Sequence, residues 1–316
     1  MKISVVIPTF NSASFIKNTM DSVLAQSYSA YEILVLDDGS TDDTVLILRS
    51  YGSLITVATQ KNQGVAHARN TLAKLAQGDL VAFLDHDDLW HPSYLAIQAK
   101  AFSLHKNAAA VFTKHITFKN DTELANWRES APSLTIEVIP SDQFIRRYNR
   151  STGTFYSMSF CVVPKMILTS LGEEPFPLTA AGVDDFFLCN QFPLYGPVVL
   201  THGELVAYRL SPNAQSLDQM KNFGLILCHY EHLERVFRAQ NRVDLLRLVD
   251  CEYASKQRSY GKILFCLSRK TEARKHFLDS LLRSWSPVSM AKSLALLVLS
   301  FLPPPFTLRG QPRYRG

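Results

Sequence analysis

Four short apolar runs alternate with helical patterns in the first 84 residues, and this alternation constrains the fold more than any other feature. The runs are rich in β-branched residues and occupy positions 3–7, 32–36, 54–58 and 80–84. Between them, helical patterns extend to about residue 26, begin at residues 41–43, and span residues 64–76. A repeated strand–helix order predicts an α/β fold, with a mostly parallel, Rossmann-like sheet flanked by helices.

Polar residues follow the apolar runs one after another. Thr9 comes after the first run, Asp37 and Asp38 after the second, and Asp85-His86-Asp87 after the fourth. In open α/β sheets, ligands bind outside the carboxyl ends of the strands. The repeated placement therefore predicts a ligand site at that edge of the sheet, and it says more than any single cluster does.

Asp85 and Asp87 stand one residue apart at the end of a buried strand, so both carboxylates can face the same crevice. Hard oxygen ligands suit Mg²⁺ or Mn²⁺, which also bridge to substrate phosphates. Acidic residues in this place also cap the following helix, a role that suits Asp88. The local sequence leaves both interpretations open.

Two further side chains lie near the same predicted edge. Asp38 can accept a hydrogen bond from a ribose hydroxyl or a base, although an isolated DDGS segment is more typical of a turn before a capped helix. Arg69 can pair with a phosphate or stack on a base, although a single helical arginine more often forms a surface salt bridge. Neither residue settles the function alone.

The segment GVDDFFLCNQF places Asp184 and Asp185 at the start of a helix that we expect over residues 183–192. A carboxylate beside an acceptor hydroxyl can serve as a general base. Acids are also common in the first turn of helices, where they face the positive end of the helix dipole. Nothing in the local sequence separates these two roles.

Several common nucleotide and hydrolase sites lack their signal in this chain. There is no GxxxxGK[ST] phosphate loop, no GxGxxG after the first apolar run, and no GxSxG elbow. These absences argue against P-loop enzymes, dinucleotide-dependent enzymes and α/β-hydrolases.

The remainder of the chain divides into a mixed middle and a helical end. Strands are expected over residues 109–118, 157–163, 198–200 and 205–210, and residues 119–150 read as a loop excursion with a short helix. Residues from about 215 to 300 read as helices, with a junction near residues 268–270. We therefore expect an α/β domain over residues 1–212 and a helical region over residues 213–316.

Charge and cysteine content bear on partners and compartment. The net charge of +5 is mild and does not require nucleic acid, and none is expected as a partner. The odd number of cysteines, five, without CxxC spacing, predicts free thiols in a reducing compartment. The N-terminus lacks the pattern of a signal peptide, and no segment reaches the roughly 20 apolar residues of a membrane span. We therefore expect a cytoplasmic protein.

The apolar segment 290–302 is preceded by Arg283, contains Lys292 and is followed by Arg309, Arg313 and Arg315. This pattern fits peripheral attachment to the inner face of the plasma membrane. It fits equally well a helix packed on the protein core or a homodimer contact. The sequence leaves the three open.

The segments VVIPTFN, LDDGSTDDT, NQGVAHARN, GDLVAFLDHDD and GVDDFFL, in that order, resemble the family 2 glycosyltransferases of the GT-A fold. The resemblance covers about residues 3–210, and the ordered set is far more specific than any one segment. It implies a nucleotide-sugar-binding GT-A catalytic domain and an inverting transfer from a nucleotide-diphosphate sugar, with a UDP-sugar as the expected donor and Mg²⁺ or Mn²⁺ as the cofactor.

The resemblance also implies a role for each matching residue. Pro8, Thr9, Phe10 and Asp38 surround the nucleoside, and Arg69 lies on the nucleotide side. Asp85 and Asp87 serve the metal and diphosphate, with Asp87 as the direct ligand. Asp185 is the catalytic base, and Asp184 stands where the family usually has Glu. One departure concerns the metal: Tyr208-Arg209 is followed by Leu210, where relatives often carry a histidine.

The acceptor implied is a glycan or a lipid-linked sugar, with bacterial surface polysaccharide synthesis as the process. Two alternatives remain open. A nucleotidyltransferase also joins an α/β nucleotide site to metal-binding carboxylates, but it usually has a Gly-rich basic loop where this chain has Pro8-Thr9-Phe10-Asn11. A catalytically silent nucleotide-sugar-binding scaffold would not need the carboxylates that this chain keeps.

Overall fold

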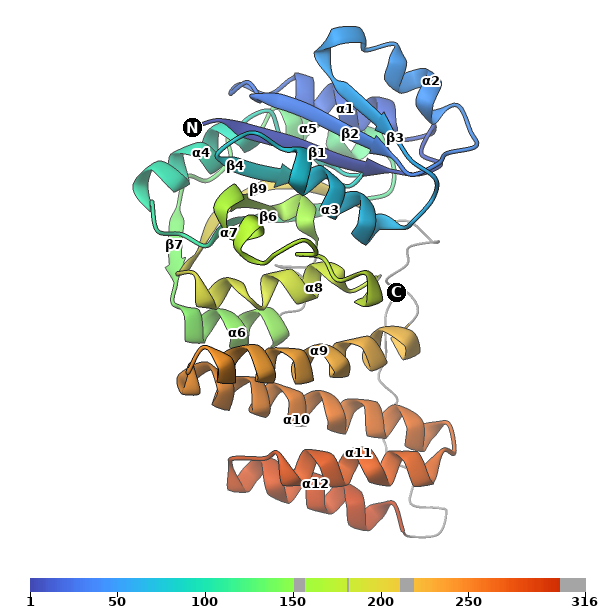
Figure 1. The fold of residues 1–316 in the computed structure, drawn as a ribbon, viewed down its shortest axis with the longest axis vertical. Coiled ribbons are helices and arrows are strands. Elements are labelled where there is room, and N and C mark those ends of the chain that lie inside the picture. The colour runs from blue at the N-terminus through green and yellow to red at the C-terminus, as the bar shows by residue number, and fades with distance from the viewer. Residues whose placement is uncertain (151–156, 181, 211–218, 302–316) are drawn as a thin grey trace. The chain divides into compact units, whose positions relative to one another are not determined.

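The computed structural model describes residues 1–150, 157–180, 182–210 and 219–301 (Figure 1). The chain forms two compact units, Met1–Asp218 and Gln219–Gly316. The domain boundary expected at residues 212 and 213 falls in the segment 211–218, outside the described residues.

The described part of the first unit holds one nine-stranded sheet, with the order β3-β2-β1-β4-β8-β6-β9-β5 and with β7 beside β9. The strands are β1 (Ile3–Thr9), β2 (Glu32–Asp37), β3 (Thr56–Thr59), β4 (Leu80–Phe83), β5 (Leu89–Trp90), β6 (Ala110–Phe118), β7 (Ile136–Ile139), β8 (Cys161–Pro164) and β9 (Val198–Arg209). Most of the ladder is parallel, in the pairs β1–β2, β2–β3, β1–β4 and β6–β9. The predicted α/β sheet is confirmed.

The helices of the first unit connect these strands. They are α1 (Ile16–Leu24), α2 (Thr44–Arg49), α3 (Val65–Leu75), α4 (Tyr94–Leu104), α5 (Ala125–Arg128), α6 (Ser141–Arg150), α7 (Lys165–Ser170) and α8 (Asp184–Cys189). Helix α3 packs against β1 and β2, and α4 packs against β6 and β9. Every residue of β1 is buried, so both faces of the sheet are covered there.

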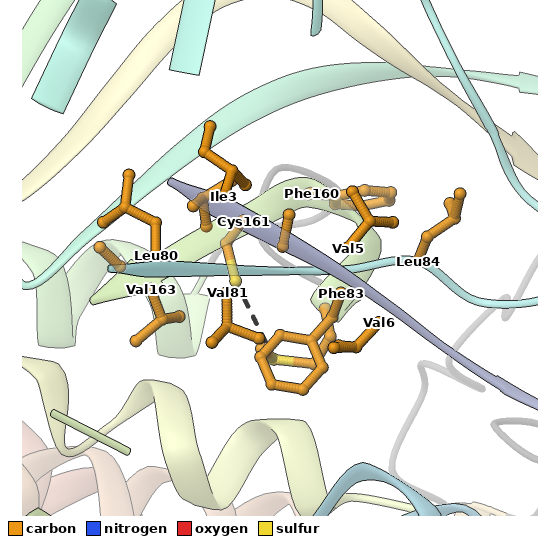
Figure 2. Close-up of a cluster of buried hydrophobic side chains, with 14 of the residues drawn as sticks. Ile3, Val5, Val6, Leu80, Val81, Phe83, Leu84, Phe160, Cys161 and Val163 are labelled. Atoms are coloured by element: carbon orange, nitrogen blue, oxygen red, sulfur yellow. Dashed lines mark hydrogen bonds between the residues drawn. The ribbon is translucent and has the colours of Figure 1, made fainter. Parts of the chain in front are cut away.

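The core lies where the parallel half of the sheet meets its antiparallel neighbour. Figure 2 shows side chains of β1, β4 and β8 meeting there, among them Val5, Val81, Phe83 and Cys161. All four of these side chains are fully buried. Continuous apolar runs form these strands because apolar side chains are needed on both faces of a covered sheet.

The middle of the chain differs from the prediction in three places. Residues 119–150 hold β7 and α6 in addition to a short helix, because β7 pairs with β9 instead of looping freely. Residues 158–160 form a 3₁₀ turn, so that the predicted strand begins only at Cys161. The two predicted closing strands form one strand, β9, whose pairing with β6 shifts register at Lys114.

The second unit consists, in its described part, of four helices: α9 (Gln219–Ala239), α10 (Val243–Cys266), α11 (Lys270–Leu282) and α12 (Pro287–Leu299). Successive helices pack on one another, and Leu264, Phe277 and Leu296 form a core between the last three. Gly261 permits the close approach of α10 and α11, since an added Cβ would lie 2.6 Å from the Phe277 ring. The predicted junction near residues 268–270 is confirmed.

Candidate active site

Parallel pairing brings the carboxyl ends of β1, β2 and β3 to the same edge of the sheet. Thr9 lies in register with Asp37, and Asp37 with Thr59. The fourth strand, β4, runs parallel to β1 and ends two residues before Asp85. The polar residues that follow these strands therefore share one edge, as expected from the sequence.

The residues expected around a nucleoside lie at the end of β1 and just after β2. Pro8 and Thr9 are buried, whereas the Phe10 side chain is 41% exposed at the edge. The next residue, Asn11, ties this end of β1 to the loop after β2, because its side chain accepts a hydrogen bond from the Thr41 N–H at 2.8 Å. Phe10 is thus presented on a fixed loop with its ring accessible.

Asp38 is buried and holds the turn that leads into α3. Its Oδ1 accepts hydrogen bonds from the Gln63 N–H at 2.9 Å and from Gln60 Nε2 at 2.7 Å. Its Oδ2 accepts one from the Gly64 N–H at 2.7 Å. Gly39 makes this packing possible, since its φ is +82° and an added Cβ would lie 2.9 Å from the Asn62 nitrogen. The carboxylate therefore organises the protein around it, and contact with a nucleoside stays a prediction.

Arg69 on α3 bridges two carboxylates that are far apart in the sequence. Its Nη1 donates to Asp184 Oδ2 at 2.6 Å, and its Nη2 donates to Asp85 Oδ1 at 2.7 Å. The Arg69 side chain is only 7% exposed. Burial opposes its positive charge, but the Asp85 and Asp184 carboxylates outweigh this effect and raise the Arg69 pKa. We call Arg69, Asp85 and Asp184 the Arg69 cluster. It is a buried ion-pair network and not the surface salt bridge that sequence alone favours.

Asp185 lies beside this cluster, in the first turn of α8. Its Oδ1 accepts a hydrogen bond from the Phe186 N–H at 2.7 Å. Burial raises the pKa of Asp185 to about 7, and the neighbouring Asp184 charge adds to this effect against the opposing Arg69 charge. A carboxyl group with a pKa near neutrality suits proton transfer, because such a group exchanges protons readily at physiological pH.

Asp85 differs from Asp185 because its charge is stabilised. Besides the Arg69 contact, its Oδ2 accepts a hydrogen bond from the Ser157 hydroxyl at 2.9 Å, and its N–H donates to Ser159 Oγ at 3.0 Å. Burial works against ionisation, but Arg69 and Ser157 hold the Asp85 pKa below its usual range. Ser157 and Ser159 belong to no motif, and sequence reasoning therefore missed them.

Asp87 and Asp88 follow on the same loop, in surroundings that disfavour a negative charge on either carboxyl group. Burial raises the pKa of Asp87, and the Asp85 charge raises it further against the opposing His86 and Arg209 charges. Burial and the charges of Asp87 and Asp85 raise the pKa of Asp88 well above its ordinary value. Asp88 Oδ2 is buried without a hydrogen-bond partner among the described residues.

Arg209, at the end of β9, fixes this loop, a role that sequence reasoning also missed. Its Nε donates to the Asp87 carbonyl oxygen at 3.0 Å, and its N–H donates to Asp88 Oδ1 at 3.1 Å. Its Nη2 donates to Asp121 Oδ1 at 2.9 Å. The pair Tyr208-Arg209 at the end of a predicted strand was the available signal, but its partners come from distant parts of the chain.

The expected divalent cation fits the chemistry of this loop. No other residue in the described part of the chain donates a hydrogen bond to the Asp87 carboxylate, and the nearby Asp85 charge helps raise the pKa of Asp87. Within the described ranges, no three His, Cys, Asp or Glu side chains form a ready metal cage. Mg²⁺ and Mn²⁺ sites that also use substrate phosphates need only one or two carboxylates, so this donor set is compatible with them.

All five cysteines are free, and Cys161 and Cys189 are buried. In the part of the chain that the structure covers, no helix combines the length and apolar character needed to span a bilayer.

Curated relatives match the N-terminal part of the chain. A protein of Bacillus subtilis (strain 168), provisionally named the teichuronic acid biosynthesis glycosyltransferase TuaG, is 36% identical over 140 residues, which cover 43% of this chain and 55% of that protein. A chondroitin synthase of Escherichia coli is 26% identical over 160 residues, which cover 50% of this chain and 23% of the synthase. The matched region is thus about half of the first relative and under a quarter of the second.

Solved structures match nearly the whole chain at low identity. Residues 1–349 of S. aureus TarS share 17% identity with a TM-score of 0.65, and the match covers 95% of this chain and 90% of that one. The mannosyltransferase PcManGT from Pyrobaculum calidifontis, solved with GDP-Man and Mn²⁺, shares 17% identity with a TM-score of 0.57, covering 96% and 81%. At this identity the likeness concerns the fold, which is the GT-A fold.

A family model described as glycosyl transferase family 2 matches residues 4–171. The match spans more than half of the 316 residues and includes the strand ends that carry Thr9, Asp38 and Asp85. Together with the GT-A fold and the carboxylates gathered at its sheet edge, this match shows that the chain belongs to glycosyl transferase family 2.

Proposed function

We propose that this protein is an inverting glycosyltransferase that moves a sugar from a nucleotide-diphosphate donor, with a UDP-sugar as the first choice, to a glycan or lipid-linked acceptor. The observation that carries the proposal is the Arg69 cluster, which joins the loop after β4 to the start of α8. That contact brings the proposed diphosphate side and the proposed base into one site. Family membership supplies the reaction class.

The donor proposal draws on the structural neighbours. One TarS structure holds UDP-GlcNAc, and the PcManGT structure holds GDP-Man with Mn²⁺. By analogy we assign Pro8, Thr9 and Phe10 to the nucleoside side, where the exposed Phe10 ring can contact a base. Asp38 acts there by fixing the turn before α3. We assign Arg69 to positioning instead of direct phosphate contact, because its terminal nitrogens already bind carboxylates.

In the proposed reaction, the acceptor hydroxyl attacks the anomeric carbon as the bond to the diphosphate breaks on the opposite face. Asp185 takes the proton of the hydroxyl, which its pKa of about 7 favours. Asp184 orients the start of α8 through its contact with Arg69. Asp87, assisted by Asp85, would hold a divalent cation, and that cation would offset the charge of the diphosphate.

Bacterial surface polysaccharide is the proposed product, since relatives are named for teichuronic acid and chondroitin synthesis. A lipid-linked acceptor would place the enzyme in the cytoplasm at the inner face of the plasma membrane. The donor would be a cytosolic nucleotide-sugar whether the acceptor is a glycan or a lipid-linked sugar.

The decisive test is a thermal-shift panel of UDP, GDP, dTDP and CMP compounds with and without Mn²⁺, followed by a transfer assay with the best donor. A ligand present at about 100 times its dissociation constant should stabilise the fold by about 2.7 kcal/mol. A shift that requires both Mn²⁺ and one nucleoside diphosphate supports the proposal. Binding without transfer to any glycan acceptor would favour a silent scaffold, and pyrophosphate release from a nucleoside triphosphate would favour a nucleotidyltransferase.

A further inference from the structure

Helix α12 has its polar side turned inward. The residues of α12 that face α10 and α11 include Ser289 and Ser293, with Leu296 as the buried apolar contact and Leu297 partly buried beside it. A surface helix of a globular protein normally buries its apolar stripe and exposes its polar one. The arrangement of α12 is the reverse, so its outer side needs a separate explanation.

A buried hydrogen-bond network accounts for the inward serines. Arg258 of α10 donates from Nη1 to Ser289 Oγ at 2.8 Å and to Ser280 Oγ at 3.0 Å. The Ser280 and Ser293 hydroxyls lie 2.8 Å apart. Serines on the inner side of α12 therefore satisfy a partly buried guanidinium, and the orientation of the helix is fixed by these contacts.

The outer side of α12 is a continuous apolar stripe. Val288, Leu294 and Val298 are 64%, 50% and 54% exposed, and Ala291 and Ala295 are exposed between them. These five residues, which we call the α12 apolar face, recur at helical spacing and so lie on one side. Lys292 is the only charged residue of the helix. Contiguous exposed apolar surface of this kind marks an interaction site.

Exposed aromatic residues with arginines over their rings stand on both sides of α12 in the sequence. Trp285, 59% exposed, lies under the Arg247 guanidinium at 5.4 Å. Phe301, 63% exposed, lies under the Arg274 guanidinium at 4.0 Å. Aromatic and basic residues beside an apolar helix face are typical of segments that rest at the boundary between lipid headgroups and acyl chains.

The net charge of the chain is concentrated in the same region. The whole chain has 33 Lys and Arg against 28 Asp and Glu. The last 37 residues contain five of those basic residues and no acidic one, so the first 279 residues balance at 28 against 28. Three of the five, Arg309, Arg313 and Arg315, lie outside the described residues, and Arg283 pairs with Glu234 at 2.7 Å, so Lys292 is the basic side chain that α12 itself carries. A stretch of sequence with basic and no acidic residues is complementary to an anionic lipid surface.

We propose that the α12 apolar face binds the surface of an anionic lipid bilayer, with the helix lying in the plane of the interface. A helix of 13 residues is roughly 20 Å long, too short to cross a hydrocarbon core of about 30 Å. A symmetric dimer through this face would bring the Lys292 side chains of both copies to one interface, where like charges repel. The inference rests on the proposed function in one respect only, which is the assignment of this bilayer surface to the inner leaflet of the plasma membrane.

The test is flotation of the full chain with vesicles, without donor or acceptor. One set of vesicles is pure phosphatidylcholine and the other contains about 30% phosphatidylglycerol, at about 0.05 M and about 0.5 M NaCl. We expect binding to the anionic vesicles at low salt, and weaker binding at high salt or to the neutral vesicles. Leu294→Gln with Val298→Gln should weaken partitioning by about tenfold or more, because two inserted apolar side chains are lost.

Leu46→Gln with Leu104→Gln is the matched control, since these leucines are 69% and 60% exposed on α2 and α4. The control should bind like the parent chain, and neither variant should change the melting temperature. Absence of flotation, or equal flotation of the α12 variant, would overturn the proposal. So would a parent dimer that the α12 variant dissociates without any vesicle binding, which would assign the face to a second copy. If the α12 variant melts at a lower temperature and the parent chain binds no vesicles, the α12 apolar face would be assigned to a contact with the chain's own tail.

Failure here is distinguishable from failure of the proposed function. Transfer to a water-soluble acceptor should be the same for the parent chain and the α12 variant, because none of the α12 residues is placed in the catalytic machinery. Loss of vesicle binding with unchanged transfer identifies a membrane contact alone.

Discussion

Asp38 and Asp185 belong to the same unit of the protein but lie in opposite electrostatic surroundings. Asp38 accepts hydrogen bonds from Gln60, Gln63 and Gly64, so both oxygens of its buried carboxyl group have donors. Asp185 accepts one from Phe186 and lies beside the charge of Asp184. A carboxylate that the fold satisfies serves structure, whereas one that the fold leaves under-satisfied is available for chemistry.

The sharpest test of that difference is Asp185→Asn. We expect turnover to fall by about 10²–10⁴, because an amide cannot take the acceptor proton, while donor affinity stays unchanged. Asp142→Asn is the matched control, since Asp142 also lies in the first turn of a helix, α6, and is exposed. Steady-state transfer and donor titration measure both quantities, and transfer near the parent rate would remove Asp185 from the base role.

Arg69→Met tests whether the Arg69 cluster holds the loop after β4 against the start of α8, where Asp185 lies. Removing one partner of a buried ion pair typically costs about 3–5 kcal/mol, because the remaining charge is left uncompensated. We expect a loss of this size in the free energy of unfolding of the first unit, followed by the fluorescence of Trp90 and Trp127 in denaturant. Arg49→Met, on the exposed end of α2, should change little. Equal stability of both variants would show that the cluster is not structural.

Asp87→Asn and Asp88→Asn separate a metal ligand from a buried neutral acid. Asp87→Asn should abolish the Mn²⁺-dependent part of the thermal shift, about 2.7 kcal/mol at 100 times the dissociation constant. Asp88→Asn should leave most of it, because burial already favours the protonated form of Asp88 and an amide has the same shape. The opposite result would move the metal site to Asp88.

Asp38→Ala tests the satisfied end of the comparison. The Gln63 and Gly64 N–H groups would lose their acceptor, which typically costs about 1–3 kcal/mol of stability. At saturating donor, the variant should keep the turnover of the parent chain, since Asp38 touches no reacting group in our proposal. Asp43→Ala, at an exposed position, is the control. A large fall in turnover at saturating donor would give Asp38 a catalytic part.

The pH dependence gives the smallest expected effect. Transfer should rise about tenfold from pH about 6 to about 8, because Asp185 with a pKa of about 7 must be deprotonated to act as base. The free energy of unfolding, by contrast, should fall as the pH rises. A raised folded-state pKa contributes stability below the ordinary pKa of Asp, near 3.9, and this contribution is lost as the pH rises through about 7. Asp185→Asn should flatten both profiles, and an unchanged profile would assign them to another group.

Much of the first half of the fold was predictable because its signals are local. The runs at residues 3–7 and 80–84 and the helix over residues 64–76 follow from burial and helical periodicity within short windows. The strand β7 was missed because its partner, β9, lies some 60 residues away and its own sequence carries a weak pattern. The single strand β9 was split in two because Gly203 interrupts its apolar pattern, whereas pairing with β6 continues through a register shift.

The sequence by itself determined the α/β class, the order of the first four strands along the chain and which polar residues follow their carboxyl ends, because strand and helix patterns are short-range. Only the tertiary structure decided how deeply each carboxyl group is buried and which charges lie next to it. Arg69 meets Asp184 across 115 positions, Arg209 meets Asp88 across 121, and Ser157 meets Asp85 across 72. A pKa depends on burial and on charges that are near in space, and neither can be deduced from the residues adjacent in the sequence. The same holds for α12, whose sequence is apolar but whose exposed side was fixed by serines bound to Arg258.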